Sequence, residues 1–173
     1  MFLFAQGSDH NISLNPDVAD LRNGNANTLI GNDGDNDLSG GAGNDILQGG
    51  AGADGITGGA GRDQMRGDAG ADSFYFTAFA DTFATVAGGV DKITDYVSGT
   101  DIIGIEAAGM GLDAGSYADS ALNASAFGLG AAATTADERF LFDGTYLLFD
   151  SDGNGANAAV IVTQISGGVL AAM

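Results

Sequence analysis

The chain has 173 residues, the length of one ordinary domain or of one module with a cap. Its 23 acidic residues outnumber 5 basic ones, and the net charge of −18 argues against nucleic acid or an anionic membrane as a partner. Cysteine is absent, which excludes disulfides and thiolate metal sites, and His10 is the only histidine, which excludes a zincin motif because that motif needs two. Divalent cations are the natural counter-charge for such a chain.

Residues 1–21 are expected to form an N-terminal leader or strand. The opening MFLF predicts a short strand, and Asn15-Pro16-Asp17 predicts a turn. The apolar run is too short for a membrane span, and it lacks the basic residues of a signal peptide. His10 lies among polar residues, so we interpret it as a solvated loop side chain, with a metal or catalytic role as the alternative.

Residues 22–75 repeat with a period of nine, as RNGNANTLI, GNDGDNDLS, GGAGNDILQ, GGAGADGIT, GGAGRDQMR and GDAGADSFY. Position eight is always apolar: Leu29, Leu38, Leu47, Ile56, Met65 and Phe74. Position six is always Asn or Asp: Asn27, Asn36, Asp45, Asp54, Asp63 and Asp72. The apolar stripe of a helix recurs about every 3.6 residues, so this period instead predicts a solenoid of turns and short strands.

The period has a direct physical interpretation. The side chain at position eight points inward and forms a thin apolar core, while positions seven and nine point outward, where Ile46 is an apolar exception. The Gly-Gly-x-Gly run allows backbone conformations closed to other residues and brings carbonyl groups close together. The aspartate at position six adds an anionic oxygen there, and calcium takes about six to eight such hard oxygen ligands.

Two nonapeptides make one coil, so repeats two apart stack on the same edge of the solenoid. The first edge carries Asn27, Asp45 and Asp63, and the second edge carries Asn36, Asp54 and Asp72. Carboxylates stacked about 4.8 Å apart repel one another unless a cation lies between them. We therefore expect about four calcium sites, two on each edge, and folding that requires calcium.

Two simpler interpretations of this segment are weaker. A flexible Gly-rich linker with scattered acids has no reason to keep an apolar residue at every ninth place. A solenoid without metal would leave the stacked acids of each edge uncompensated.

Three of the nonapeptides, GGAGNDILQ, GGAGADGIT and GGAGRDQMR, resemble in full the GGxGxDxUx pattern of the repeats-in-toxin (RTX) family, where U is a large apolar residue. GDAGADSFY departs from it with Asp68 at position two, and the first two nonapeptides carry Asn in the aspartate place. The resemblance implies a right-handed parallel β-roll that holds Ca²⁺ between its turns. It also implies the ligands, which are the side chain at position six and the carbonyls at positions two and four: Asn27, Asn32, Gly34, Asn36, Gly41, Gly43, Asp45, Gly50, Gly52, Asp54, Gly59, Gly61, Asp63, Gly70 and Asp72.

Residues 76–173 are expected to form a C-terminal β-rich cap, so the whole fold is all-β. Alternating apolar residues predict strands at 74–76, 93–96, 102–105, 140–142, 146–149 and 160–165. Asp143-Gly144 predicts a hairpin turn, and the Ala- and Gly-rich stretch 113–137 predicts a loop with a helical turn near residues 117–123. The phrases VDKITDYVSGTDIIGI and DERFLFDGTYLLFDSDGNGANAAVIVTQI resemble the tail of secreted RTX proteins, which implies export through a type I secretion apparatus.

The tail holds two further groups of acidic residues. Asp91, Asp95 and Asp101 either bind an ion that caps the roll or serve as ordinary polar residues. Asp150, Asp152 and Asn154 either form a plain hairpin turn or a calcium site, although the glutamate that completes an EF-hand loop is missing. Glu106 and Glu138 are isolated in the sequence and indicate no carboxylate pair for acid–base catalysis.

These patterns favour a secreted, extracellular calcium-binding protein that folds on calcium outside the cell, has no catalytic activity and has a structural or self-assembling role. Homo-oligomers would form through open strand edges, and the cell surface is a possible location. The alternative is the C-terminal calcium-binding and secretion module of a larger secreted enzyme or toxin. An ice- or sugar-binding module is a weaker alternative, since outward threonines and exposed aromatics are few. An enzyme is weaker too, because no base is positioned to activate a nucleophile.

Overall fold

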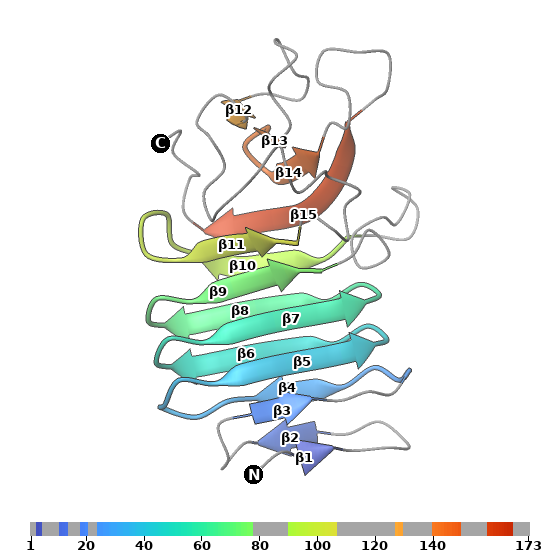
Figure 1. Ribbon diagram of the computed structural model, residues 1–173, viewed down its shortest axis with the longest axis vertical. Helices are drawn as coiled ribbons and strands as arrows, with labels where there is room; N and C mark the ends of the chain where they lie inside the picture. The colour runs from blue at the N-terminus through green and yellow to red at the C-terminus, as the bar shows by residue number, and fades with distance from the viewer. Residues whose placement is uncertain are drawn as a thin grey trace.

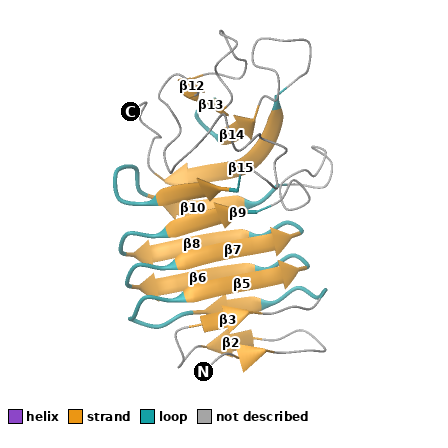
Figure 2. Cartoon of the chain, viewed as in Figure 1, coloured by secondary structure: helices purple, strands orange, loops and turns teal. Residues whose placement is uncertain are grey.

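The computed structural model consists entirely of β-strands and connecting segments wherever the chain is described (Figures 1 and 2). The described residues are 3–4, 11–13, 18–20, 24–77, 90–106, 127–129, 140–149 and 159–167. Four sequence predictions lie outside them: the environment of His10, the turn at 15–17, the helical turn near 117–123, and the motif at 150–154. Among the described residues, no helix has the length and apolarity to cross a membrane.

The repeats form six strands: β4 (Thr28–Ile30), β5 (Asp37–Ala42), β6 (Ile46–Ala51), β7 (Gly55–Ala60), β8 (Gln64–Ala69) and β9 (Ser73–Phe76). Each strand begins at position seven, and β5 to β8 continue through position three of the next nonapeptide. Alternate strands pair in parallel, with Leu38 opposite Ile56 and Leu47 opposite Met65. Two nonapeptides therefore make one coil, which confirms the predicted parallel β-roll.

The roll extends beyond the repeats at both ends. Near the N-terminus, β1 (Leu3–Phe4), β2 (Asn11–Ser13) and β3 (Val18–Asp20) join the two sheets. After the repeats follow β10 (Lys92–Tyr96), β11 (Ile102–Ile105), β12 (Phe127–Leu129), β13 (Phe140–Phe142), β14 (Tyr146–Phe149) and β15 (Val160–Gly167). The six-stranded sheet has the order β1-β3-β5-β7-β9-β11, and the nine-stranded sheet has the order β12-β13-β14-β15-β10-β8-β6-β4-β2.

Strands β10 and β11 continue the periodic pattern in a form that the sequence conceals. Ile93 pairs with Met65 and Ile103 pairs with Phe74, so both isoleucines occupy position eight. Asp91 and Asp101, two residues earlier, then occupy position six. The spacing hides them, because Asp91 follows Asp72 by 19 residues and Asp101 follows Asp91 by 10, instead of nine each time.

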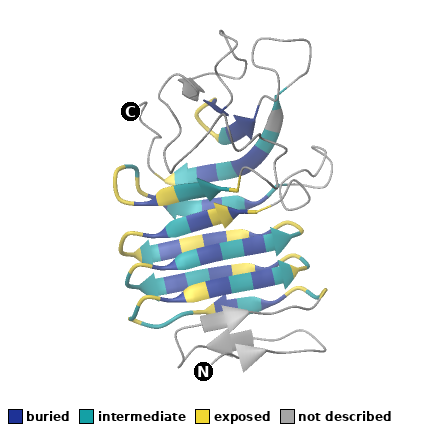
Figure 3. Cartoon of the chain, viewed as in Figure 1, coloured by how far each residue is buried: buried dark blue, intermediate teal, exposed yellow. Residues whose placement is uncertain are grey.

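The core of the roll consists of buried side chains at position eight, which come alternately from the two sheets. Leu29, Leu38, Ile56, Met65 and Phe74 at position eight have no exposed surface, and buried residues alternate with more exposed ones along β5 to β8 (Figure 3). The outward Ile46 is 48% exposed, as expected for position seven.

Position one also faces inward, which the sequence did not indicate. A Cβ added to Gly40 would lie 2.6 Å from both the Asp45 carboxylate and the Gly58 carbonyl oxygen, so only glycine fits there. The backbone at position one thus lies directly against the acidic edge of the roll.

The C-terminal cap has a bulkier core than the repeats. The predicted hairpin is confirmed: β13 and β14 pair antiparallel across Asp143-Gly144, and the rings of Phe140 and Phe149 lie 5.2 Å apart. The prediction of a loop with a helical turn over 113–137 is wrong at 127–129, because β12 lies there and pairs in parallel with β13. Only three residues of β12 pair, too few to stand out in an Ala- and Gly-rich stretch.

Candidate metal centre

The side chains at position six form two continuous ladders, one along each edge of the roll. On the first edge, a carboxylate oxygen of Asp45 accepts the backbone N–H of Asn27 at 2.7 Å, and Asp63 accepts that of Asp45 at 2.8 Å. Asp91 continues this ladder by accepting the N–H of Asp63 at 2.7 Å. Each side chain therefore binds the backbone of the preceding coil.

The second edge repeats this arrangement. Asp54 accepts the N–H of Asn36 at 2.7 Å, Asp72 accepts that of Asp54 at 3.0 Å, and Asp101 accepts that of Asp72 at 3.1 Å. The turns of this edge lie on the left in Figure 1, where β6 and β8 end. Both predicted stacks are present, and Asp91 and Asp101 make each of them one carboxylate longer than the period of nine indicated.

Burial makes these carboxylates unusual. All six predicted position-six residues are at most 3% exposed. The second oxygen, Oδ2, of Asp45 and of Asp54 is buried without a hydrogen-bond donor among the described residues. Neither polar atom of the Asn27 amide has a partner there. A buried anionic oxygen without a partner costs free energy that a bound cation would offset, so these residues fit an oxygen-binding metal ion such as calcium.

The pKa shifts of these carboxylates also favour a bound cation. Burial raises the pKa of Asp45 to about 7, against the lowering effect of its hydrogen bond from Asn27 and with a further rise from the Asp63 charge. Burial likewise raises the pKa of Asp54 and of Asp72, and the hydrogen bonds that they accept oppose the rise. Neighbouring carboxylates, Asp101 among them, raise the pKa of Asp72 further. Without a cation, the ladders are therefore under charge strain at neutral pH.

Backbone carbonyls border the same turns. In the full repeats, the glycines at positions two and four have positive φ, for example 98° at Gly59 and 145° at Gly61. A Cβ on either glycine would collide with the carbonyl oxygen of Gly41 or Gly43 in the preceding coil. These turns are therefore stacked closely, with their carbonyl groups between them.

Carbonyls at position one also lie beside the ladders, and the predicted ligand set did not include them. A Cβ on Gly40 would contact both Asp45 Oδ2 and the Gly58 oxygen, and a Cβ on Gly49 would contact both Asp54 Oδ2 and the Gly67 oxygen. No group of three acidic or histidine side chains gathers at one point in the described part of the chain. An ion on either edge would therefore depend on backbone oxygens as well as carboxylates.

The turn at 31–36 differs from those of the full repeats. Asn36 Oδ1 accepts the N–H of Asn32 at 2.7 Å, and Asn32 Oδ1 accepts the N–H of Gly34 at 2.7 Å. The amide oxygens of this turn are thus engaged within the turn itself, and both are neutral. This end of the second edge offers an ion less charge than the turn of Asp54.

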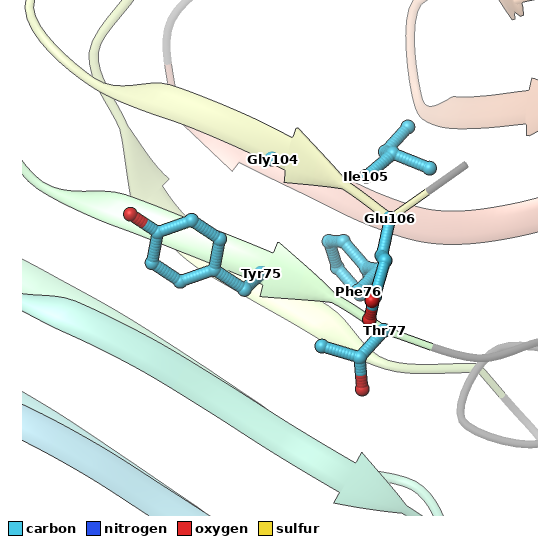
Figure 4. A pocket seen from close by; sticks show the side chains of 6 residues that line it. All are labelled: Tyr75, Phe76, Thr77, Gly104, Ile105 and Glu106. Carbon is cyan, nitrogen blue, oxygen red and sulfur yellow. The ribbon is translucent and has the colours of Figure 1, made fainter. Parts of the chain in front are cut away.

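The chain also has a hollow of about 300 Å³ at the ends of β9 and β11 (Figure 4). Its lining consists of Tyr75, Phe76, Thr77, Gly104, Ile105 and Glu106. Glu106 is the single carboxylate in this lining, so the hollow lacks the carboxylate pair that acid–base hydrolysis would use.

Comparison with known proteins also indicates that the repeats bind calcium. A family model described as the RTX calcium-binding nonapeptide repeat matches residues 23–56 and 56–83. These residues are RTX calcium-binding nonapeptide repeats. RTX nonapeptide repeats bind calcium ions, and the two acidic edges of this roll have the composition for that chemistry.

A solved structure is similar over most of this chain. It is the solution structure of the AlgE6R3 subunit from the Azotobacter vinelandii mannuronan C5-epimerase, with 28% sequence identity and a TM-score of 0.51. The match covers 82% of this chain and 70% of that one, and it agrees with the all-β roll. No curated protein matches the chain.

Proposed function

We propose that this chain is a non-catalytic RTX protein whose roll folds when it binds calcium outside the cell. The observation that carries the proposal is the pair of buried carboxylate oxygens, Asp45 Oδ2 and Asp54 Oδ2, that lack a hydrogen-bond donor among the described residues. Calcium, when bound, supplies positive charge between carboxylates that otherwise repel one another. The repeat carboxylates and the carbonyls at positions two and four would hold the ions.

The protein's own residues determine what happens without calcium. The carboxylates of each ladder repel one another, while the thin core contributes one large side chain per nonapeptide. Such a segment would stay open in a cytosol that holds little calcium and would fold after export. We propose type I secretion as the route, which the resemblance of the C-terminal region to secreted RTX proteins supports.

We also propose a structural role with self-assembly through strand edges. Within the described part of the chain, β1 and β11 end the six-stranded sheet with one partner each. Ile102 on β11 is 61% exposed. An unprotected strand edge with exposed apolar side chains can pair with another chain.

A second candidate function is a calcium-binding module of a larger secreted enzyme. One observation favours it, namely the similarity to a subunit from a mannuronan C5-epimerase. In that case the roll would assist export and folding of a catalytic neighbour. The reading frame around this segment in its gene distinguishes the two candidates directly.

A calcium titration followed by circular dichroism and light scattering tests the proposal. Calcium should raise the β signal, and Mg²⁺ should not replace it, because Mg²⁺ demands a tight octahedron and gives up its water reluctantly. A rise in scattering at high protein concentration would support assembly, whereas a monodisperse monomer would contradict it. An unchanged, cooperative melting curve after chelation would contradict calcium-dependent folding itself.

A further inference from the structure

The pairing between the sixth nonapeptide and the last coil is incomplete. β6 and β8 stay paired as far as Ala51 opposite Ala69. By contrast, β8 and β10 pair only at Gln64 with Lys92 and at Met65 with Ile93. Beyond this point the register between β10 and β15 shifts. The backbone of β8 after Met65 therefore needs other partners.

Asp95 supplies these partners from the end of β10. One carboxylate oxygen of Asp95 accepts the N–H of Gly67 at 3.1 Å, and the other accepts the N–H of Asp68 at 2.8 Å. Both N–H groups lie where the chain enters the turn of Asp72, on the second edge. Hydrogen bonds to a charged acceptor are among the stronger ones in proteins.

A guanidinium group lies where two carboxylates of this turn approach each other. Arg66 Nη2 lies 2.5 Å from Asp68 Oδ1, and Arg66 Nε lies 3.6 Å from Asp95 Oδ2. Gln48 Nε2 donates to the other oxygen of Asp68 at 2.6 Å. Arg66 thus places a positive charge beside both of these acids.

The backbone of Asp68, in the same turn, has an unusual conformation. Its φ of 68° is the one positive value at a non-glycine residue in the described part of the chain. It stands at position two, where the full repeats have glycine. A side chain in this region of φ is usually unfavourable, but here the carboxylate contacts both Arg66 and Gln48.

The last carboxylate of the second edge differs from those inside the roll. Asp101 accepts the N–H of Asp72 at 3.1 Å with one oxygen and the N–H of Val97 at 2.7 Å with the other. The second oxygen of Asp54 has no such donor among the described residues. Asp101 therefore does not present the unpaired oxygen that suits an ion in the repeats.

We propose that the last coil is joined to the repeats on the second edge by Asp95, Arg66 and the Val97 N–H, in place of a calcium ion. We call these groups and their partners Gly67, Asp68 and Asp101 the seam. The proposal rests on the proposed calcium-dependent folding, because it marks where that dependence ends. The seam keeps β8 attached to β10, and through β10 to the C-terminal cap, when calcium is absent.

Amide hydrogen exchange measured by NMR on the full chain, with calcium and after its removal, tests the seam. On calcium removal, the amides of β5 to β7 should lose protection, while those of Gly67 and Asp68 keep theirs. Asp95→Asn should lower protection of these two amides about tenfold or more in both conditions, since one charged acceptor is lost. Arg66→Gln should lower it by a smaller factor, because the arginine side chain is 55% exposed.

Asp35→Asn is the matched control, because Asp35 accepts the N–H of Ala53 within the repeats and its loss removes the same charge. It should leave the exchange of Gly67 and Asp68 unchanged. The seam is wrong if these amides lose protection together with β5 to β7, or if Asp95→Asn leaves their exchange unaltered. Should β5 to β7 keep protection without calcium, the proposed function fails, and Asp95→Asn still decides the seam.

Discussion

The carboxylate of Asp45 binds the backbone N–H of Asn27, which lies 18 residues earlier and one coil away. One oxygen of Asp45 thereby fixes the spacing of two coils, and the other is left buried without a donor among the described residues. The same side chain thus holds the coils in register and creates the charge that separates them. The proposed calcium dependence follows from this double role.

Removing two of these charges should weaken the response to calcium. In Asp45→Asn/Asp54→Asn, each edge loses an anionic ligand, so the calcium concentration at half-folding should rise about tenfold or more. Without calcium, the variant should be more stable than the parent, because two repelling charges are gone. Circular dichroism during a calcium titration measures both effects. Asp37→Asn, which removes an exposed acid at position seven, outside the ladders, should leave the midpoint nearly unchanged.

Acid should partly replace calcium. The pKa of Asp45 is raised to about 7 in the folded, calcium-free roll, from an ordinary value of 3.8. A group with a raised folded-state pKa stabilises the fold at low pH, and that stabilisation is lost as pH rises through about 7. The chelated protein should therefore gain β signal as pH falls from about 7 towards 4. Loss of structure over this range would contradict the buried ladders.

Calcium affinity should fall as pH falls, whereas the stability of the calcium-free roll should rise. Protons and calcium compete for the carboxylates at position six, since an ion binds only the ionised form. The calcium concentration that half-saturates the folded roll should therefore rise as pH falls below about 7. Titrations at several pH values measure this shift, and a midpoint independent of pH would exclude Asp45 and its neighbours as ligands.

Glycine at position one should be irreplaceable. The Cβ of Gly40→Ala would lie 2.6 Å from Asp45 Oδ2 and from the Gly58 carbonyl oxygen, so the backbone must shift. Overpacking of this kind costs about 1–3 kcal/mol of unfolding free energy. Gly24→Ala is the control, because no atom lies within 4 Å of the added carbon. Thermal unfolding in saturating calcium compares the two, and equal melting temperatures would contradict the tight packing at position one.

Two neighbouring residues, one in the core and one on the surface, give a matched pair of truncations. Leu47 is 1% exposed and Ile46, its neighbour, is 48% exposed. Leu47→Ala should therefore lower the unfolding free energy by about 2–5 kcal/mol, whereas a surface change such as Ile46→Ala should stay within about 0.5 kcal/mol. Denaturant unfolding with calcium present measures both. Equal losses would mean that position eight is not the core.

Much of the fold follows from the period of nine. Because the strands repeat one nonapeptide after another, the inward row at position eight and the two acidic edges were predictable from Leu38, Asp45 and their counterparts. The tail strands from β9 to β15 were also predictable, apart from β12, since short alternating runs such as Phe140-Leu141-Phe142 stand out. The pattern was readable wherever the spacing stayed regular.

What sequence could not indicate depends on irregular spacing or on backbone geometry. Asp91 and Asp101 escape a search for period nine, because insertions displace them, although the structure returns both to position six. The roles of Asp95 and Arg66 arise where strand pairing stops, which no local pattern marks. Carbonyls at position one carry no side-chain signal at all. The ligand assignments of Asn27, Asp63 and the other repeat residues remain predictions for the experiments above.

The alternation of strands between two sheets limits how such a chain can change length. Deleting two consecutive nonapeptides would shorten the stack by a full coil and leave every later strand in its own sheet. Deleting one nonapeptide would shift β10 into the other sheet, away from β15 and the rest of the C-terminal cap. Variation in length among such chains should therefore occur in steps of two nonapeptides, because only such steps leave β10 in the same sheet as β15.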